Sequence, residues 1–249
     1  MAAAELRSTA WAGVAAQQRL FGEHLAGASV VAGVGWTGSL VPSAPEPALL
    51  NVAVPDQPEI VPDLDELRAT FAPHDVRWGV WVDPESAGTA RFASLGMETV
   101  NACVVMAIEL GDRPGTPGTP DAKGVRQTED LRFVAALNDR AYGLMDRRLE
   151  RHFGVLPSSA VHAHRIGDDA VVAAVDHRDD ASLFFVATAP GRRRRGFGTA
   201  IVAGALAAAA QRRRRTATLL ATPDGVRIYE RLGFRVLGHA ALWATRRRT

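Results

Sequence analysis

A short basic segment containing glycines constrains the second half of this chain more than any other feature. Residues 182–198 read SLFFVATAPGRRRRGFG, where an apolar run predicts a buried strand and Pro190-Gly191 ends it. The alanine-rich residues 199–211 that follow have a strong helical propensity. The predicted order is therefore a strand, a basic turn with glycines, and a helix.

This order is typical of an anion-binding site. The N–H groups at the beginning of a helix point at one spot, together with the positive end of the helix dipole. Gly196 and Gly198 allow a close approach of phosphate to the backbone, and the arginines at 193–195 can pair with its oxygens. A Walker A loop is excluded because the chain has no Gly-Lys pair. A Rossmann fingerprint is excluded because Ile201 stands where its third glycine is needed.

Two motifs in this half resemble one family. The R-x-x-G-x-G spacing of Arg193, Gly196 and Gly198 resembles the acetyl-CoA pyrophosphate loop of the GNAT superfamily of N-acetyltransferases. Residues 228–234, IYERLGF, lie at the family's distance downstream and look like its LY-x-x-LGF motif. From Val125 onward, the predicted order of helices and strands is similar to the full GNAT fold.

The resemblance implies acetyl-CoA as co-substrate and no metal. One stretch matches the strand end that pairs through its backbone with the pantetheine arm, and the next matches the pyrophosphate cradle. Thr222 stands where the family often has an asparagine, and its hydroxyl can still form a hydrogen bond. The implied cofactor-binding residues are Val186, Ala187, Thr188, Arg193, Arg194, Arg195, Gly196, Phe197, Gly198, Thr199 and Thr222.

Tyr229 matches the family's general-acid tyrosine, which protonates the sulfur of coenzyme A. The alternative is a core aromatic on an apolar helix face beside Ile228 and Leu232. No general base is visible, because the strand at 182–188 carries no acidic residue, and a water chain is an equal alternative. The aspartates of the preceding turn are expected to be solvated: Asp176, Asp179 and Asp180.

The first half echoes the second, since residues 92–97, FASLGM, lie over residues 229–234, YERLGF. This repeat resembles a tandem GNAT protein with a decayed first copy, and the alternative is a chance match at a helix end. Phe92 stands in place of the tyrosine, and the loop between Val54 and Leu64 is acidic and has no glycine. Such a loop would repel a pyrophosphate, so no cofactor is expected in residues 1–110.

The predicted fold class is α+β, with two tandem GNAT-like domains, each a mostly antiparallel mixed sheet flanked by helices. A Gly- and Pro-rich linker at 111–124 separates a domain at 1–110 from a catalytic domain at 125–249. The first 120 residues carry 6 Arg and 14 acidic residues, whereas the rest is strongly basic, which suggests different roles. In the first half we expect helices at 4–26, 64–71 (capped by Asp63) and 84–95, strands at 49–54 and 76–82, and a strand–turn–strand at 97–110.

Other features limit the class of protein. Cys103 is the only cysteine and lies in an apolar run, so we expect a buried, inert thiol and a reducing, cytoplasmic location. We expect no signal peptide and no membrane span. The H-x-H pair at His162 and His164 has no third ligand at metal spacing and is interpreted as structural. Arginine runs at 212–215 and 246–248 are solvated charges, a clamp on the 3′-phosphate of coenzyme A, or weak nucleic-acid contacts.

The predicted function is an N-acetyltransferase that moves acetyl from acetyl-CoA to a primary amine by direct attack in a ternary complex. The expected partner is a small-molecule or peptide amine, and the protein is expected to be a monomer or homodimer. Nucleic acid is disfavoured as a partner because no aromatics are interleaved in the arginine runs. The alternative is a non-catalytic acyl-CoA-binding or nucleic-acid-binding module.

Overall fold

One sheet runs through the whole molecule. The computed structural model describes residues 1–86, 88–111, 124–143 and 149–246. Within these residues the sheet has 11 strands in the order β1-β2-β3-β4-β11-β5-β10-β9-β8-β7-β6. The strands are β1 (Ser29–Gly33), β2 (Trp36–Leu40), β3 (Val52–Pro55), β4 (Gly79–Val82), β5 (Met97–Glu109), β6 (Val125–Thr128), β7 (His162–Ile166), β8 (Ala170–His177), β9 (Asp180–Thr188), β10 (Thr216–Ala221) and β11 (Arg235–Thr245). The α-helices are α1 (Ala3–His24), α2 (Leu64–Phe71), α3 (Ala90–Ser94), α4 (Leu131–Ala141), α5 (Glu150–Phe153), α6 (Phe197–Gln211) and α7 (Val226–Arg231).

The same arrangement of strands and helices occurs twice. Each half contains a parallel strand pair joined through a helix, β3 and β4 through α2, and β9 and β10 through α6. A short helix follows the second strand of each pair, α3 in the first half and α7 in the second. Both parallel pairs are short: β3 and β4 pair only to Ala53↔Val80, and β9 and β10 only to Leu219↔Leu183. Beyond these residues the strands of each pair diverge.

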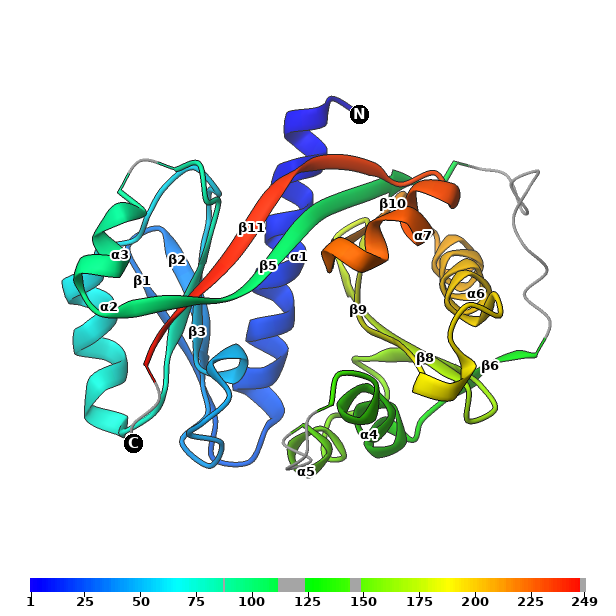
Figure 1. Ribbon diagram of the computed structural model, residues 1–249, viewed down its shortest axis with the longest axis horizontal. Helices are drawn as coiled ribbons and strands as arrows, with labels where there is room; N and C mark the ends of the chain where they lie inside the picture. The colour runs from blue at the N-terminus through cyan, green and yellow to red at the C-terminus, as the bar shows by residue number, and fades with distance from the viewer. Residues whose placement is uncertain (87, 112–123, 144–148, 247–249) are drawn as a thin grey trace.

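The two halves exchange their final strands. β5 of the first half pairs with β10 of the second, from Thr216↔Glu109 to Ala221↔Val104. β11 of the second half pairs with β4 of the first, and β5 and β11 pair with each other across the middle of the molecule (Figure 1). Neither residues 1–110 nor residues 125–249 alone therefore hold a complete sheet. The domain division at the linker stays a proposal, and residues 112–123 of that linker lie outside the described residues.

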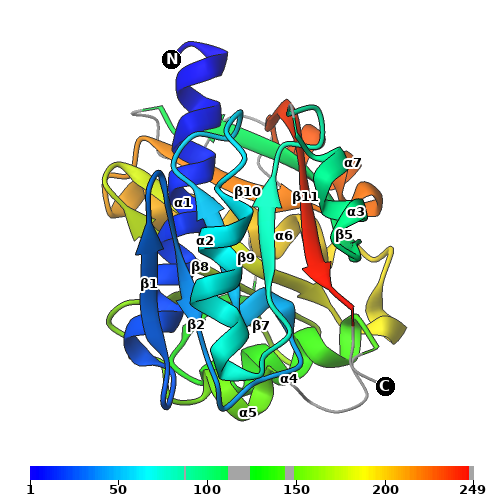
Figure 2. The same cartoon turned by 90° about the vertical axis from the view of Figure 1, so that its left-hand side faces the viewer.

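Helix α1 belongs to both halves. It packs against β1 to β3 of the first half and β8 to β10 of the second (Figures 1 and 2). Gly13 allows this approach, because a Cβ there would lie 2.6 Å from Ser182 Oγ. Gln17 Nε2 donates to Ser182 Oγ at 2.8 Å, and the Phe21 ring meets that of Phe184 with 6.0 Å between centroids. The first-half helix thus forms part of the second half's core.

The sequence predicted correctly the features that depend on neighbouring residues. It failed where the pairing of distant strands decides the structure. Asp63 caps α2 as predicted, its Oδ1 accepting from the N–H groups of Asp65 at 2.8 Å and Glu66 at 3.1 Å. The expected strand–turn–strand at 97–110 is wrong: these residues form the single strand β5, which β10 and β11 pair from either side. The helix expected over 84–95 is limited to α3. The sequence also predicts a second helix after α4, over residues 144–153. Residues 144–148 lie outside the described residues, and α5 follows them.

Candidate functional site

A hollow of about 80 Å³ opens where β9 and β10 diverge. Pairing between these strands ends at Leu183↔Leu219, so the β9 backbone beyond Leu183 has no β10 partner. β9 is irregular here, since Phe185 has a φ of 50° and the register against β8 slips between Val171 and Ala173. A free strand edge can pair with an extended polar chain. The lining residues are Asn138, Tyr142, Leu183, Phe184, Phe185, Val186, Leu219, Leu220, Thr222 and Tyr229.

The basic turn lies just beyond this strand edge. A 3₁₀ turn at Pro190–Arg192 follows β9, and α6 begins at Phe197. Arg194 with a φ of 62° and Gly196 with a φ of 85° give the turn its shape. Among the described residues, the N–H groups of residues 193–199 have no intramolecular acceptor. Free N–H donors at the start of a helix, here one of 15 residues, are groups that can bind an anion.

The arginines of the turn have different surroundings. Arg192 makes two hydrogen bonds with the carboxylate of Asp169, at 2.6 and 3.0 Å, and its guanidinium lies 5.5 Å from the centre of the Phe197 ring. Arg193 Nη2 donates to the carbonyl of Ala141 at the end of α4. The remaining two predicted arginines, Arg194 and Arg195, are exposed. Those two are the side chains of the turn best placed to meet an incoming anion.

The sequence left open whether Tyr229 is a core aromatic or a residue of the site, and its surroundings in the structure have features of both. Its side chain is 8% exposed and meets the Phe234 ring edge-on, with 5.7 Å between centroids, as a core aromatic does. It also lines the hollow, together with Val186 and Thr222. Burial raises the pKa of Tyr229 well above its usual range, so the phenol keeps its proton at neutral pH.

The other predicted cofactor residues lie close to these. Ala187 is buried in the core beneath α4. Thr188 lies at the end of β9, and its Oγ1 is 3.5 Å from the place of a Cβ on Gly198. Phe197 and Thr199 begin α6 and are partly buried. The structure therefore brings the predicted strand end and the predicted turn into one continuous region.

Two lining residues, Asn138 and Tyr142, were not predicted from the sequence. Both come from the end of α4, which is distant in sequence from the motifs of the second half. The Tyr142 hydroxyl donates to the carbonyl of Val186 at 3.3 Å. The sequence signal that could have pointed to Tyr142 is that the chain contains only two tyrosines.

The expectation that the aspartates before β9 are solvated is wrong for Asp180. Asp180 is 1% exposed, because it begins a central strand and faces two hydroxyl donors. Thr216 Oγ1 donates to it at 2.8 Å and Thr218 Oγ1 at 2.6 Å. Burial raises the pKa of Asp180 to about 6, and the nearby Asp176 adds to this. Asp180 lies at the opposite end of β9 from the hollow, so it is no candidate for the base.

The histidine pair lies at this same remote end. His162 Nε2 is 3.4 Å from the carboxylate of Asp176, which also accepts from Arg212 at 2.9 Å. His164 is buried, and burial lowers its pKa to about 4, with Arg212 and His162 contributing. Arg212 follows the last residue of α6, one helix length of about 22 Å from the basic turn. A clamp on the 3′-phosphate beside that turn is therefore excluded for Arg212.

The first half has a different interior at the equivalent divergence of β3 and β4. There Trp11 of α1 and Trp81 of β4 pack with Val54 in one buried cluster. Arg7 pairs with Asp83 just after β4 and reaches Glu59 at 3.1 Å. Two indoles and an ion-pair group thus lie where the second half has its hollow.

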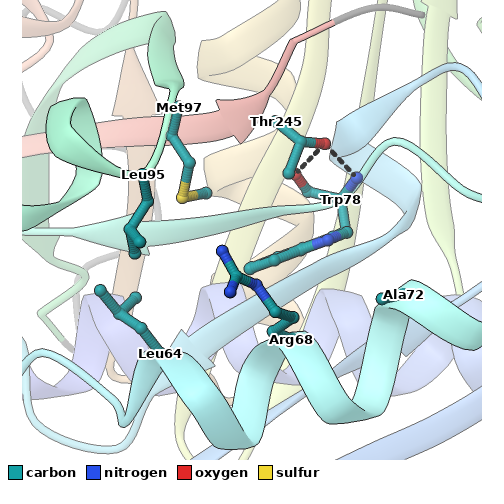
Figure 3. Close-up of a pocket in the computed structure, with 7 residues that line it drawn as sticks. All are labelled: Leu64, Arg68, Ala72, Trp78, Leu95, Met97 and Thr245. Atoms are coloured by element: carbon teal, nitrogen blue, oxygen red, sulfur yellow. Dashed lines mark hydrogen bonds between the residues drawn. The ribbon is translucent and has the colours of Figure 1, made fainter.

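A separate hollow of about 150 Å³ lies on the helix-covered side of the first half (Figure 3). It is bounded by α2, the segment between α3 and the start of β5, the residue before β4 and the end of β11. Its lining is mostly apolar, with one guanidinium: Leu64, Arg68, Ala72, Trp78, Leu95, Met97 and Thr245. In the described residues, no group of three metal-ligating side chains occurs. Among the same described residues, no helix is long and apolar enough to span a bilayer.

Known proteins resemble this chain in part of its sequence and in its fold. Residues 157–236 match a family model described as an acetyltransferase (GNAT) domain. A search of the curated proteins found no significant match. Among solved structures, a GCN5-related N-acetyltransferase from Kribbella flavida is similar, with a TM-score of 0.66 and 21% identity over 96% of each chain. A tandem GNAT protein from the clavulanic acid biosynthesis pathway has a TM-score of 0.52 and 15% identity, over 84% of this chain and 78% of that one.

At such identities the two structures establish a shared fold and nothing more. They confirm the predicted mixed α+β class and the tandem GNAT-like architecture. The family match lies wholly in the second half and includes β9, the basic turn, α6 and Tyr229. Residues 157–236 are therefore similar to a GNAT acetyltransferase domain, within a chain that shares the fold of a tandem GNAT protein.

Proposed function

We propose that the protein is an acetyl-CoA-dependent N-acetyltransferase that acetylates a primary amine by direct attack in a ternary complex. The observation that carries the proposal is a convergence at one point of the sheet. A free strand edge, a buried phenol and an anion-binding helix start all meet where β9 and β10 diverge. These are the three features that a thioester of a phosphorylated carrier needs: a track for the arm, a proton donor and a phosphate site.

The residues of this region fit acetyl-CoA. The free N–H groups of residues 193–199, with the exposed Arg194 and Arg195, suit a pyrophosphate. The β9 backbone from Val186 to Thr188, which pairs with β8 but has no β10 partner, offers its free edge to the amides of the pantetheine arm. Thr222 lines the hollow and offers its hydroxyl. When bound, acetyl-CoA supplies the activated acetyl group.

Tyr229 then acts as the general acid. The amine nitrogen forms a bond to the acetyl carbon while the C–S bond breaks, and the Tyr229 hydroxyl gives its proton to the departing sulfur. The raised pKa of Tyr229 keeps the phenol protonated at neutral pH, so its hydroxyl is available as a donor to the departing sulfur. The residues described as lining the hollow include no carboxylate, so we propose that water carries the amine's proton away.

The test separates binding from chemistry. We expect Tyr229→Phe to lower kcat by about 100-fold or more, the low end of what general acid–base catalysis contributes. The affinity for acetyl-CoA should change little, because the packing of the ring against Phe234 survives. Calorimetry with acetyl-CoA and release of thiol across a panel of amines measure the two effects.

Each outcome of this test has a distinct meaning. No heat and no thermal shift at millimolar acetyl-CoA would refute the proposal. Binding without turnover of any amine in the panel would favour a non-catalytic acyl-CoA-binding module instead. Nearly full turnover in Tyr229→Phe would leave the transferase but remove Tyr229 as its acid.

We propose further that residues 1–110 form a GNAT-like domain that binds no cofactor, while residues 125–249 form the catalytic domain. The position of Trp11, Trp81 and the Arg7–Asp83 pair at the equivalent divergence of β3 and β4 supports this division. Dialysis with acetyl-CoA should therefore give one bound molecule per chain. A second equivalent would contradict the proposal.

A further inference from the structure

Both tyrosines of the chain line the same hollow. They reach it from opposite faces of the sheet. Tyr229 comes from α7 and belongs to the apolar cluster beneath α6, whereas α4, which precedes Tyr142, packs in the cluster on the other face. The proposed mechanism uses one phenol and leaves the other without a role.

Tyr142 makes a specific contact within that hollow. Its hydroxyl donates to the carbonyl of Val186 at 3.3 Å, although its side chain is 52% exposed. Val186 lies on the part of β9 that has no β10 partner. A pantetheine amide that pairs with this strand edge needs backbone acceptors of this kind. The phenol and the cofactor arm would therefore compete for one carbonyl.

A second contact ties the same segment to the basic turn. Arg193 Nη2 donates to the carbonyl of Ala141, the residue before Tyr142. Arg193 belongs to the turn that we propose for the pyrophosphate. Two contacts at the end of α4, one through Ala141 and one through Tyr142, thus engage groups that the cofactor would bind.

We propose that Tyr142 is a further residue of the transfer site, whose hydroxyl occupies the Val186 carbonyl in the free protein and yields it to acetyl-CoA. This inference rests on the proposed function. The arm takes over the carbonyl, and the hydroxyl is released into the hollow. Because part of the arm's interaction replaces an existing hydrogen bond, removing the hydroxyl should tighten binding. The bond is long and the ring half exposed, so the gain should be about 2- to 4-fold in Kd, the low end for a hydrogen bond.

The experiment compares two probes on the full chain. We expect Tyr142→Phe to bind acetyl-CoA about 2- to 4-fold more tightly than the wild type by calorimetry. Adenosine 3′,5′-bisphosphate, which lacks the pantetheine arm, should bind both proteins equally. The thermal midpoint checks that the variant is folded.

Ring-¹³C-labelled tyrosine gives a second, independent readout. The chain contains two tyrosines, so NMR should show two sets of ring signals, which Tyr142→Phe and Tyr229→Phe assign. The Tyr142 signals should shift on adding acetyl-CoA and stay in place on adding the bisphosphate.

The inference and the proposed function fail in different ways. Equal or weaker binding of acetyl-CoA by Tyr142→Phe, or Tyr142 signals that stay in place at saturating acetyl-CoA, would overturn the inference alone. Absence of any acetyl-CoA binding to the wild type would overturn both.

Discussion

Replacing Asp180 with asparagine should stabilise the protein at neutral and alkaline pH. In the folded state burial raises the pKa of Asp180 from 3.8 to about 6, although two threonine hydroxyls donate to its carboxylate. The unfolded chain therefore releases this proton first as the pH rises. The increase in pKa corresponds to a loss of about 3 kcal/mol of unfolding free energy, which begins near pH 4 and is complete above about pH 7.

The substitution Asp180→Asn would keep the contacts and remove the charge. The carbonyl of the new side chain can accept from one threonine hydroxyl while its amide donates to the oxygen of the other. The variant should gain up to about 3 kcal/mol over the wild type at pH 8 and close to nothing at pH 4. Urea denaturation at five pH values between 4 and 8, followed by tryptophan fluorescence, measures the difference.

The neighbouring Asp179→Asn is the matched control. It makes the same change in charge one residue away, at an exposed position, and should give a small difference at all pH values. A gain for Asp180→Asn that is independent of pH, or a loss at pH 8, would refute the claim that the buried carboxylate destabilises the fold.

Further substitutions test three separate parts of the structure. Burial lowers the pKa of His164 to about 4, below its unfolded value of 6.5, so the folded state should lose about 3 kcal/mol of stability as the pH falls from 6.5 to 4. In denaturation curves, His164→Gln should lose this acid sensitivity. An unchanged loss of stability at acid pH would contradict this prediction. Gly13→Ala places a Cβ 2.6 Å from Ser182 Oγ and should destabilise by about 1–3 kcal/mol, with partial rescue by Ser182→Gly in thermal melts; additive effects would argue against the contact. Gly198→Glu should abolish acetyl-CoA binding in calorimetry while the protein stays folded, as should Gly196→Glu, and unchanged affinity in a folded variant would refute the turn as the phosphate site.

Short-range signals account for what the sequence predicted. The strand, basic turn and helix around residues 182–211 follow from apolar runs, glycines and alanines that lie next to one another. Tyr229 was found through a motif within seven residues. These features depend on neighbours in the chain, so the sequence alone was enough to locate them.

Contacts between distant segments account for the rest. β5 is one strand because β10 and β11 pair with it, and both are more than 100 residues away in the chain. Asp180 is buried because Thr216 and Thr218 face it from the neighbouring strand β10. Tyr142 reaches the hollow because α4 packs on β9. No local pattern contains this information.

The exchange of final strands has a consequence for the order in which the protein can form during synthesis. β4 is complete at Val82, but the strand that covers its free edge, β11, ends at Thr245. While the intervening residues are made, β4 carries an unpaired apolar edge that includes Val80. Such edges invite pairing with other chains, and partners so far apart in sequence meet slowly. We therefore expect the first half to reach its native form last, although it leaves the ribosome first.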